Sequence, residues 1–125
     1  MNCLIVGGAY QGKCAFVQKK FHLQPEDIAD GASVCLDEPF VQKAICNVHQ
    51  LVRRTLAMGI SNDTVLEFLQ GKIVLCDEVG CGVVPIEREQ DAWREAVGRL
   101  CCDLAERADA VYWVRAGITQ QIKGG

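Results

Sequence analysis

A glycine-rich segment near the start of the chain has the residue types and the spacing of a phosphate-binding loop. It follows the pattern G-x-x-x-x-G-K, and its members are Gly7, Gly8, Ala9, Tyr10, Gln11, Gly12, Lys13 and Cys14. Glycines let the backbone turn its N–H groups toward phosphate oxygens, and Lys13 would reach the β- and γ-phosphates of a nucleotide. A helix that starts at Lys13 would add the positive end of its dipole. The alternative is a tight strand-to-helix turn that carries a solvated lysine.

Cys14 departs from the full phosphate-binding signature, which ends in Ser or Thr. The hydroxyl of that residue binds Mg²⁺, a hard cation that prefers oxygen ligands, and a thiol is a poor substitute. The sequence therefore supports a phosphate-binding fold better than it supports a competent magnesium-dependent catalyst.

A second candidate segment is the apolar run of residues 73–76, which is followed by Asp77 and Glu78. In P-loop enzymes an acid in this position holds Mg²⁺, and a neighbouring glutamate can orient or deprotonate an attacking group. Asp77 is therefore the candidate metal ligand, and Glu78 joins Lys13 as a candidate catalytic residue. Asp77 would also supply a hard oxygen in place of the hydroxyl that is missing at Cys14. The alternative for Asp77 is a carboxylate that only caps a loop or a helix.

Strand-like and helix-like segments alternate along the chain. Strands are expected at residues 2–6, 32–36, 72–77 and 110–114, with a short edge strand at 118–122. Helices are expected at residues 13–21, between Asp37 and Gly59, at 61–71 and at 87–107. The alternation predicts an α/β fold of the P-loop NTPase type, with three layers and a mainly parallel central sheet. Residues 1–125 would form a single nucleotide-binding domain, with the loops after Val6 and Asp77 on the edge where such folds bind ligands.

Composition and charge argue against several classes of protein. The 125 residues carry a net charge of −3 and contain no run rich in Lys and Arg, so no nucleic-acid partner is expected. No apolar run approaches the roughly 20 residues that span a bilayer, and the first residues lack the pattern of a signal peptide. We therefore expect a cytoplasmic protein without a membrane partner.

The eight cysteines show no C-x-x-C spacing. Reduced thiols that pack as small hydrophobic groups are predicted, in preference to disulfides or a zinc site. Cys3, Cys35 and Cys76 are expected in strands, and Cys46, Cys101 and Cys102 in helices.

Four segments together resemble a known family in their order and spacing. They are residues 7–13 of the glycine loop, the sequence Glu-Val-Gly-x-Gly-Val-Val-Pro at 78–85, Gly-Arg-Leu at 98–100 in a long helix, and residues 108–118. The family is the bifunctional adenosylcobinamide kinase / adenosylcobinamide-phosphate guanylyltransferase of cobalamin biosynthesis. The resemblance covers the start of the chain, through the first predicted helix, and nearly everything from Ile73 onward.

The resemblance implies a function and a set of ligands. Members of this family bind a nucleoside triphosphate at the P-loop, phosphorylate the aminopropanol hydroxyl of adenosylcobinamide, and then transfer GMP from GTP through a guanylylated histidine. For this chain it implies Mg²⁺ with ATP or GTP, a corrinoid substrate and a homo-oligomer, which is a trimer in the family. It also implies a substrate-side loop that includes Val79, Gly80, Gly82 and Pro85.

The chain differs from the family pattern mainly in its middle, which is shorter and lacks a clear counterpart of the segment with the acceptor histidine. Guanylyl transfer is therefore less well supported than phosphorylation. His49, with Arg53 one helical turn later, is the candidate guanylyl acceptor; a simple surface histidine is the alternative. The other differences are Cys14 for Ser, Tyr10-Gln11 for Arg-Ser, and Cys76-Asp77 for Thr-Asn.

Three functional hypotheses follow from the sequence. The first is a nucleotide-dependent phosphotransferase of the cobinamide kinase type, which Lys13, Asp77 and Glu78 favour. The second is a non-catalytic nucleotide-binding module, which Cys14 and the short middle favour, and the third is a structural subunit that assembles with a full-length relative. Neither ATP nor GTP is preferred, because the chain has no base-reading motif such as N-K-x-D.

Overall fold

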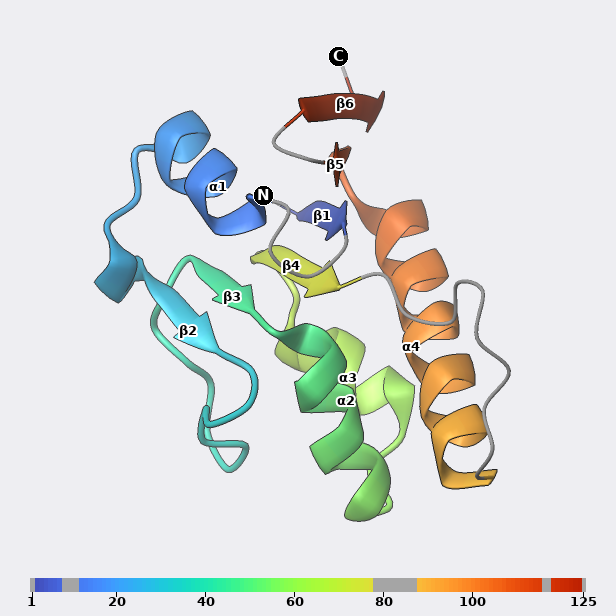
Figure 1. The fold of residues 1–125 in the computed structure, drawn as a ribbon. Helices are drawn as coiled ribbons and strands as arrows, with labels where there is room; N and C mark the ends of the chain where they lie inside the picture. Colours follow the sequence, from blue (N-terminus) through green and yellow to red (C-terminus); the bar gives the residue numbers. More distant parts are fainter. Residues whose placement is uncertain (1, 8–11, 78–87, 116–117, 125) are drawn as a thin grey trace.

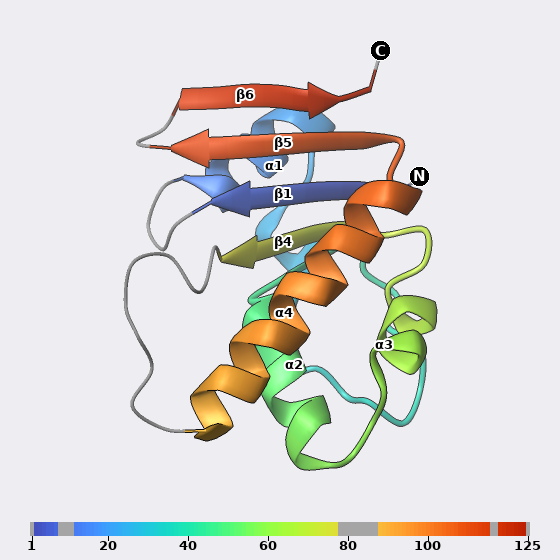
Figure 2. The ribbon, with the colours of Figure 1, turned by 90° about the vertical axis from the view of Figure 1, so that its right-hand side faces the viewer.

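A six-stranded sheet forms the centre of the molecule (Figure 1). The computed structural model describes residues 2–7, 12–77, 88–115 and 118–124, with the backbone alone at 88–91. The strand order is β2-β3-β4-β1-β5-β6. The strands are β1 (Cys3–Gly7), β2 (Ile28–Asp30), β3 (Ala44–Cys46), β4 (Ile73–Asp77), β5 (Ala110–Arg115) and β6 (Ile118–Lys123). β1 to β5 pair in parallel, and β6 runs antiparallel to β5 at the edge (Figure 2).

Helices cover both faces of the sheet, which confirms the predicted three-layer α/β fold. They are α1 (Lys13–Phe21), α2 (Val48–Ala57), α3 (Asn62–Phe68) and α4 (Arg88–Arg107), with a 3₁₀ turn η1 at Pro25–Asp27. One core packs the sheet against α1, through Val17, and the other packs it against α2, α3 and α4. Figures 1 and 2 show α1 on one side of the strands and the other three helices on the opposite side.

The central strand β1 fixes the register of the sheet around the glycine loop. It pairs with β4 on one side and β5 on the other, so that Gly7 lies opposite both Asp77 and Val114. A Cβ atom on Gly7 would collide with the Val114 carbonyl oxygen, which leaves room for glycine alone. The apolar runs of β1 and β4 are buried on both faces, as expected for inner parallel strands. The ends of β1 and β4 therefore meet at one point of the sheet edge.

The expected strand at residues 32–36 is wrong, and the two real strands lie on either side of it. Asp30 redirects the chain here: its carboxylate accepts from the Ala32 N–H at 2.9 Å, and its carbonyl accepts from the N–H groups of Ser33 and Val34. Such local bonds favour a turn over a strand. Arg54 of α2 holds this turn by donating to the carbonyl oxygens of Gly31 and Val34.

The expected long helix between Asp37 and Gly59 is also wrong over its first half. Residues 44–46 form β3, and α2 begins only at Val48, after Asn47 in a left-handed conformation with φ 53°. The apolar residues of β3 and α2 together imitate helical spacing, although they belong to two elements. Gly59 does follow the end of α2 with a φ of +73°, as predicted.

The remaining predicted elements are confirmed. They are the helices at 13–21, 61–71 and 87–107, the strands at 2–6, 72–77 and 110–114, and the edge strand at 118–122. Ser61 caps α3 by accepting from the Thr64 N–H, and His22 ends α1 in a left-handed conformation.

On the edge strand β6, Ile118 is 74% exposed and Ile122 is 58% exposed. The expected homo-oligomer stays a prediction.

Within the described ranges, no helix is long and apolar enough to cross a membrane. The seven cysteines in those ranges are all free thiols. Two of them lie in other elements than expected, because Cys35 is exposed in the turn after β2 and Cys46 belongs to β3.

The packing of α4 against the sheet predicts a large effect of one core truncation. Leu100 is fully buried between α4 and the sheet, so Leu100→Ala should lower the free energy of unfolding by about 2–5 kcal/mol in urea titrations. The control is Leu56→Ala on α2, where the side chain is 41% exposed and the loss should stay below about 1 kcal/mol. Equal losses in the two variants would contradict the described core.

Candidate functional site

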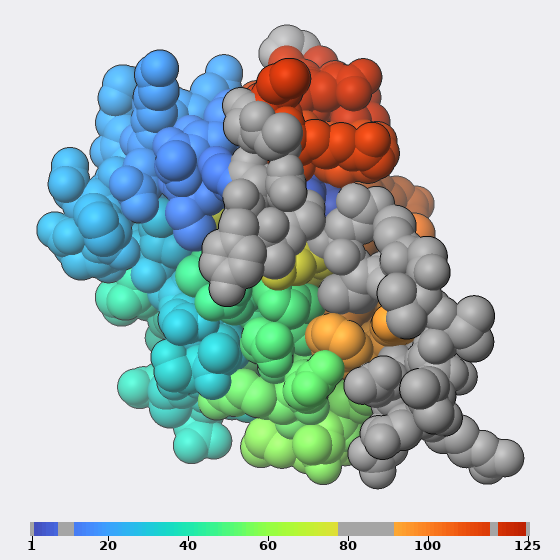
Figure 3. All heavy atoms as spheres, in the orientation of Figure 1, coloured from blue at the N-terminus to red at the C-terminus, as the bar shows by residue number. Residues whose placement is uncertain are grey.

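The largest of the described cavities opens at the edge where the parallel strands end. Its volume is about 890 Å³. It is lined by Gly12, Lys13, Cys14, Ala15, Ala32, Cys46, Asn47, His49, Gln50, Leu75 and Asp77. The arrows of β1, β4 and β5 point left in Figure 2, so Figures 1 and 3 look onto this edge. In Figure 3, α1 (blue) and β6 (red) lie above α2 (green) on this face.

Lys13 joins the glycine loop to the acid at the end of β4. Its ammonium lies 2.7 Å from Asp77 Oδ1 and donates to the Gly7 carbonyl oxygen at 3.2 Å. The side chain of Lys13 is 9% exposed and that of Asp77 is 22% exposed, so the pair is largely shielded from water. Gly12, with a φ of 93°, turns the chain into α1 directly before Lys13. The predicted phosphate-contacting lysine and the predicted metal-binding acid therefore lie side by side.

His49 holds Asp77 from the opposite side. Its Nδ1 accepts from the Asp77 backbone N–H at 3.3 Å, and its Nε2 lies 3.4 Å from Asp77 Oδ2. Burial lowers the pKa of His49, and the charges of Lys13 and Arg53 lower it further, against an opposing effect of Asp77. The ring is therefore neutral near pH 7, with its proton on Nε2 facing the carboxylate.

The first turn of α2 is anchored to α4. The indole N–H of Trp93 donates to the His49 carbonyl oxygen at 2.7 Å, and the Arg53 guanidinium lies 4.2 Å from the centre of the Trp93 ring. The long helix α4, which lies on the same side of the sheet as α2, thus supports the backbone that carries His49.

Two thiols complete the wall of the cavity next to Lys13. Cys14 lies in the first turn of α1 and is exposed, and Cys46 ends β3 and is half-buried. The side-chain interaction between the two thiols lowers the pKa of Cys14 and raises the pKa of Cys46. Cys46 and its neighbours Asn47 and Gln50 were not predicted as site residues, because residues 37–59 were expected to form one helix.

The donor atoms of the cavity fit only one kind of metal site. Asp77 would supply the hard oxygen ligand, and no group of three or more His, Cys, Asp or Glu side chains in the described ranges could enclose an ion. Mg²⁺ is often held by one or two carboxylates together with substrate phosphates and water. The site therefore fits a Mg²⁺ ion that arrives with a nucleotide, and not a cage made by the protein alone.

The predicted site residues divide into two groups. Gly7, Gly12, Lys13, Cys14, His49 and Asp77 are brought together at this edge. The others, which are Gly8, Ala9, Tyr10, Gln11, Glu78, Val79, Gly80, Gly82 and Pro85, lie outside the described residues.

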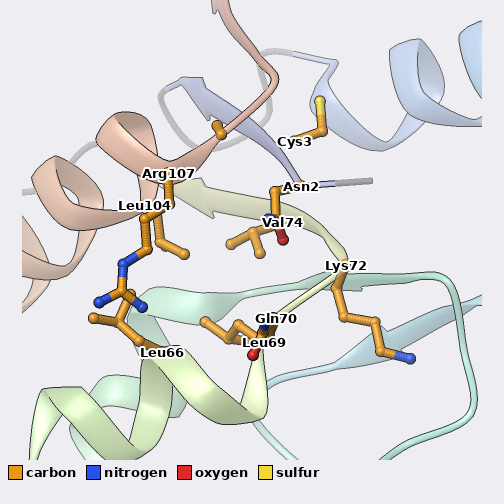
Figure 4. Close-up of a pocket in the computed structure, with 10 residues that line it drawn as sticks. Asn2, Cys3, Leu66, Leu69, Gln70, Lys72, Val74, Leu104 and Arg107 are labelled. Carbon is orange, nitrogen blue, oxygen red and sulfur yellow. The ribbon is translucent and has the colours of Figure 1, made fainter.

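A second cavity, of about 310 Å³, lies at the opposite end of the strands (Figure 4). Leu66 of α3, Leu69 directly after that helix, and Leu104 and Arg107 of α4 line it, while the Lys72 side chain points away. The Lys72 amine instead donates to the carbonyl oxygens of Phe40 and Gln42. Because parallel α/β sheets bind ligands at the carboxyl ends of their strands, the larger cavity is the candidate site.

The sheet, the glycine turn into α1 and the acid at the end of the neighbouring strand define an α/β protein of the P-loop NTPase type. The family model described as cobinamide kinase / cobinamide phosphate guanyltransferase matches residues 45–122, which is more than half of the chain. The chain therefore belongs to this family of nucleotide-related transferases of cobalamin biosynthesis. No curated protein matches the chain. The matched range runs from β3 to β6 and leaves out the glycine loop.

The depressed pKa of His49 predicts a loss of stability in weak acid. The unfolded chain takes up a proton on this histidine as the pH falls below its ordinary pKa of 6.5, while the folded chain resists it. The free energy of unfolding should therefore fall between about pH 8 and pH 5, and fall less in His49→Gln. Urea titrations across this range make the comparison, and equal pH dependence in both proteins would contradict the buried neutral ring.

Proposed function

We propose that the protein is a nucleotide-dependent phosphotransferase that moves the γ-phosphoryl group of ATP or GTP to the hydroxyl of adenosylcobinamide. The observation that carries the proposal is the pairing of Lys13 and Asp77 in one cavity at the carboxyl edge of the sheet. Membership of the family supplies the substrate class.

The cavity offers the contacts that a triphosphate needs. The first turn of α1 presents backbone N–H groups and the positive end of a helix dipole, and Lys13 supplies the cation. Lys13 lies against Asp77, so nucleotide binding would exchange a carboxylate oxygen for phosphate oxygens at the ammonium. Asp77 is then released from Lys13 while His49 still holds it, and it becomes available to a Mg²⁺ ion, which would neutralise phosphate charge.

Phosphoryl transfer requires little covalent chemistry from the protein. The hydroxyl oxygen of the substrate forms a bond to the γ-phosphorus while the bond from that phosphorus to the β–γ bridging oxygen breaks. The electron pair of the broken bond leaves with the nucleoside diphosphate, and the hydroxyl proton passes to Glu78, the base suggested by the sequence. Lys13 balances the charge that develops on the transferred group.

Guanylyl transfer through His49 is not part of the proposal. A covalent acceptor needs a ring nitrogen with a free lone pair directed at the phosphorus. In His49 the lone pair of Nδ1 accepts the Asp77 N–H, and the Nε2 proton faces the Asp77 carboxylate. This geometry suits a residue that positions Asp77.

A non-catalytic nucleotide-binding module is the second candidate. The observation that favours it is Cys14. Its thiol stands in place of the hydroxyl that usually binds Mg²⁺, and its side chain interacts with that of Cys46. Nucleotide binding without phosphorylation of adenosylcobinamide would identify this function, whereas turnover would identify the phosphotransferase.

Removal of the Lys13 cation should abolish nucleotide binding. In Lys13→Ala, the rise in Tm that GTP or ATP produces in the wild type should disappear, because the phosphates lose their buried cationic partner. Lys19→Ala, on the exposed surface of the same helix, is the matched control and should keep the full rise. A Tm shift that survives in a folded Lys13→Ala protein would overturn the proposed phosphate site.

Replacement of Asp77 by an amide should weaken only the magnesium-dependent part of binding. Asp77→Asn keeps the shape of the side chain but loses the charge that Mg²⁺ requires. Calorimetric titrations of GTP and ATP, with and without Mg²⁺, should show a strong effect of the metal in the wild type and a much smaller one in the variant. An unchanged metal effect would make Asp77 a purely structural residue.

A further inference from the structure

Two cysteines line one side of the candidate nucleotide cavity. Cys14 is the residue directly after Lys13, in the first turn of α1, and Cys46 is the last residue of β3. Both line the cavity of about 890 Å³. The cavity wall thus combines positions that are far apart in the sequence, where α1 lies over the sheet.

The alternation of side chains along β3 explains why Cys46 lies on the same side of the sheet as α1. Ala44 packs into the core beneath α1, Ile45 packs into the core beneath α2, and Cys46 returns to the α1 side. Cys46 is therefore directed at the helix that begins with Lys13 and Cys14.

The surroundings give the two thiols different reactivity. Cys14 is exposed, so a small oxidant reaches it from the cavity mouth, whereas Cys46 is half-buried behind it. The pKa of Cys14 is lowered to about 6, mainly by the side-chain hydrogen bond with Cys46 and also by the Lys13 charge, while burial opposes this shift. The same bond, together with burial, raises the pKa of Cys46. Cys14 is thus the thiolate that attacks the oxidant, and Cys46 is the thiol that then attacks the oxidised Cys14 sulfur.

We propose that Cys14 and Cys46 form an oxidant-sensitive dithiol site, in which a hydroperoxide converts the pair to a disulfide that closes the nucleotide cavity. The closing effect rests on the proposed function of the cavity, while the formation of the disulfide does not. The bridge would fix the first turn of α1 against β3, beside the lysine that phosphates must reach.

The reaction balances with hydrogen peroxide as the oxidant. The Cys14 thiolate attacks one peroxide oxygen, the O–O bond breaks, and the leaving hydroxide takes up a proton as water, which leaves Cys14 as a sulfenic acid. The Cys46 sulfur then attacks the Cys14 sulfur, the S–O bond breaks, and the departing hydroxide takes the Cys46 proton to form a second water. Two thiols have been oxidised to one disulfide and one peroxide has been reduced to two waters.

A second pair of thiols provides a contrast within the same protein. Cys76 and Cys101 lie 3.7 Å apart, but on the α4 side of the sheet, where Cys76 is fully buried. An oxidant in solution has no open path to Cys76, so the pair in the cavity should react first.

The deciding experiment treats the reduced protein with hydrogen peroxide in small molar excess and maps the cross-linked peptides by mass spectrometry. A Cys14–Cys46 linkage as the first disulfide supports the site. It should be absent from Cys46→Ser and Cys14→Ser, and present in the control Cys102→Ser, which removes an exposed thiol of α4. Linkage through other cysteines, or over-oxidation of Cys14 without any disulfide, overturns the site.

A calorimetric titration of the oxidised protein with GTP and ATP tests the closing effect. Affinity should fall by about tenfold or more on oxidation and return after dithiothreitol, because phosphate oxygens lose access to the Lys13 side of the cavity. Unchanged affinity in fully linked protein overturns the closing effect. If the reduced protein binds neither nucleotide, the closing effect fails with the proposed function, and the peptide map alone decides whether the dithiol site exists.

Discussion

The carboxylate of Asp77 is the group on which the arrangement of the candidate site depends. Lys13 holds one oxygen, His49 faces the other, and the His49 ring also accepts the Asp77 backbone N–H. These contacts join β4, α1 and α2 at one point. Removal of one partner from a buried ion pair generally costs about 3–5 kcal/mol, because the other charge is left uncompensated. Lys13, His49 and Asp77, which are the candidate functional residues, therefore also stabilise the fold.

The parts of the fold that could be predicted from the sequence are those with long or unambiguous patterns. The continuous apolar runs of β1 and β4 and the 20-residue helix α4 stand out from their neighbours. The region from Ile28 to Asn47 could not be predicted, because β2 and β3 have only three residues each. Tertiary contacts decide that region: Gly31 donates to the Cys46 carbonyl oxygen, and Asn47 donates to the Asp30 carboxylate.

The same division explains which site residues the sequence revealed. Lys13 and Asp77 belong to motifs whose chemistry requires their residue types, so their pattern alone identified them. His49 was identified as a candidate acceptor, but its contacts with Asp77 depend on the placement of α2 and were not foreseen. Cys46 was missed because its strand was missed. The family model matches the middle of the chain as well, where the motif-based resemblance had found no clear counterpart.

The tight packing of Gly7 makes this glycine weak evidence of nucleotide binding. Its hydrogen atom points at the Val114 carbonyl oxygen, and any side chain would push β5 away from the central strand. Selection for folding alone would therefore retain this glycine in a descendant that had lost its nucleotide. Lys13 is different, because burial of its ammonium group is a liability that only an anionic partner compensates. In sequence comparisons among distant relatives, the lysine and its acidic partner are thus the better markers of a functioning phosphate site than the first glycine of the loop.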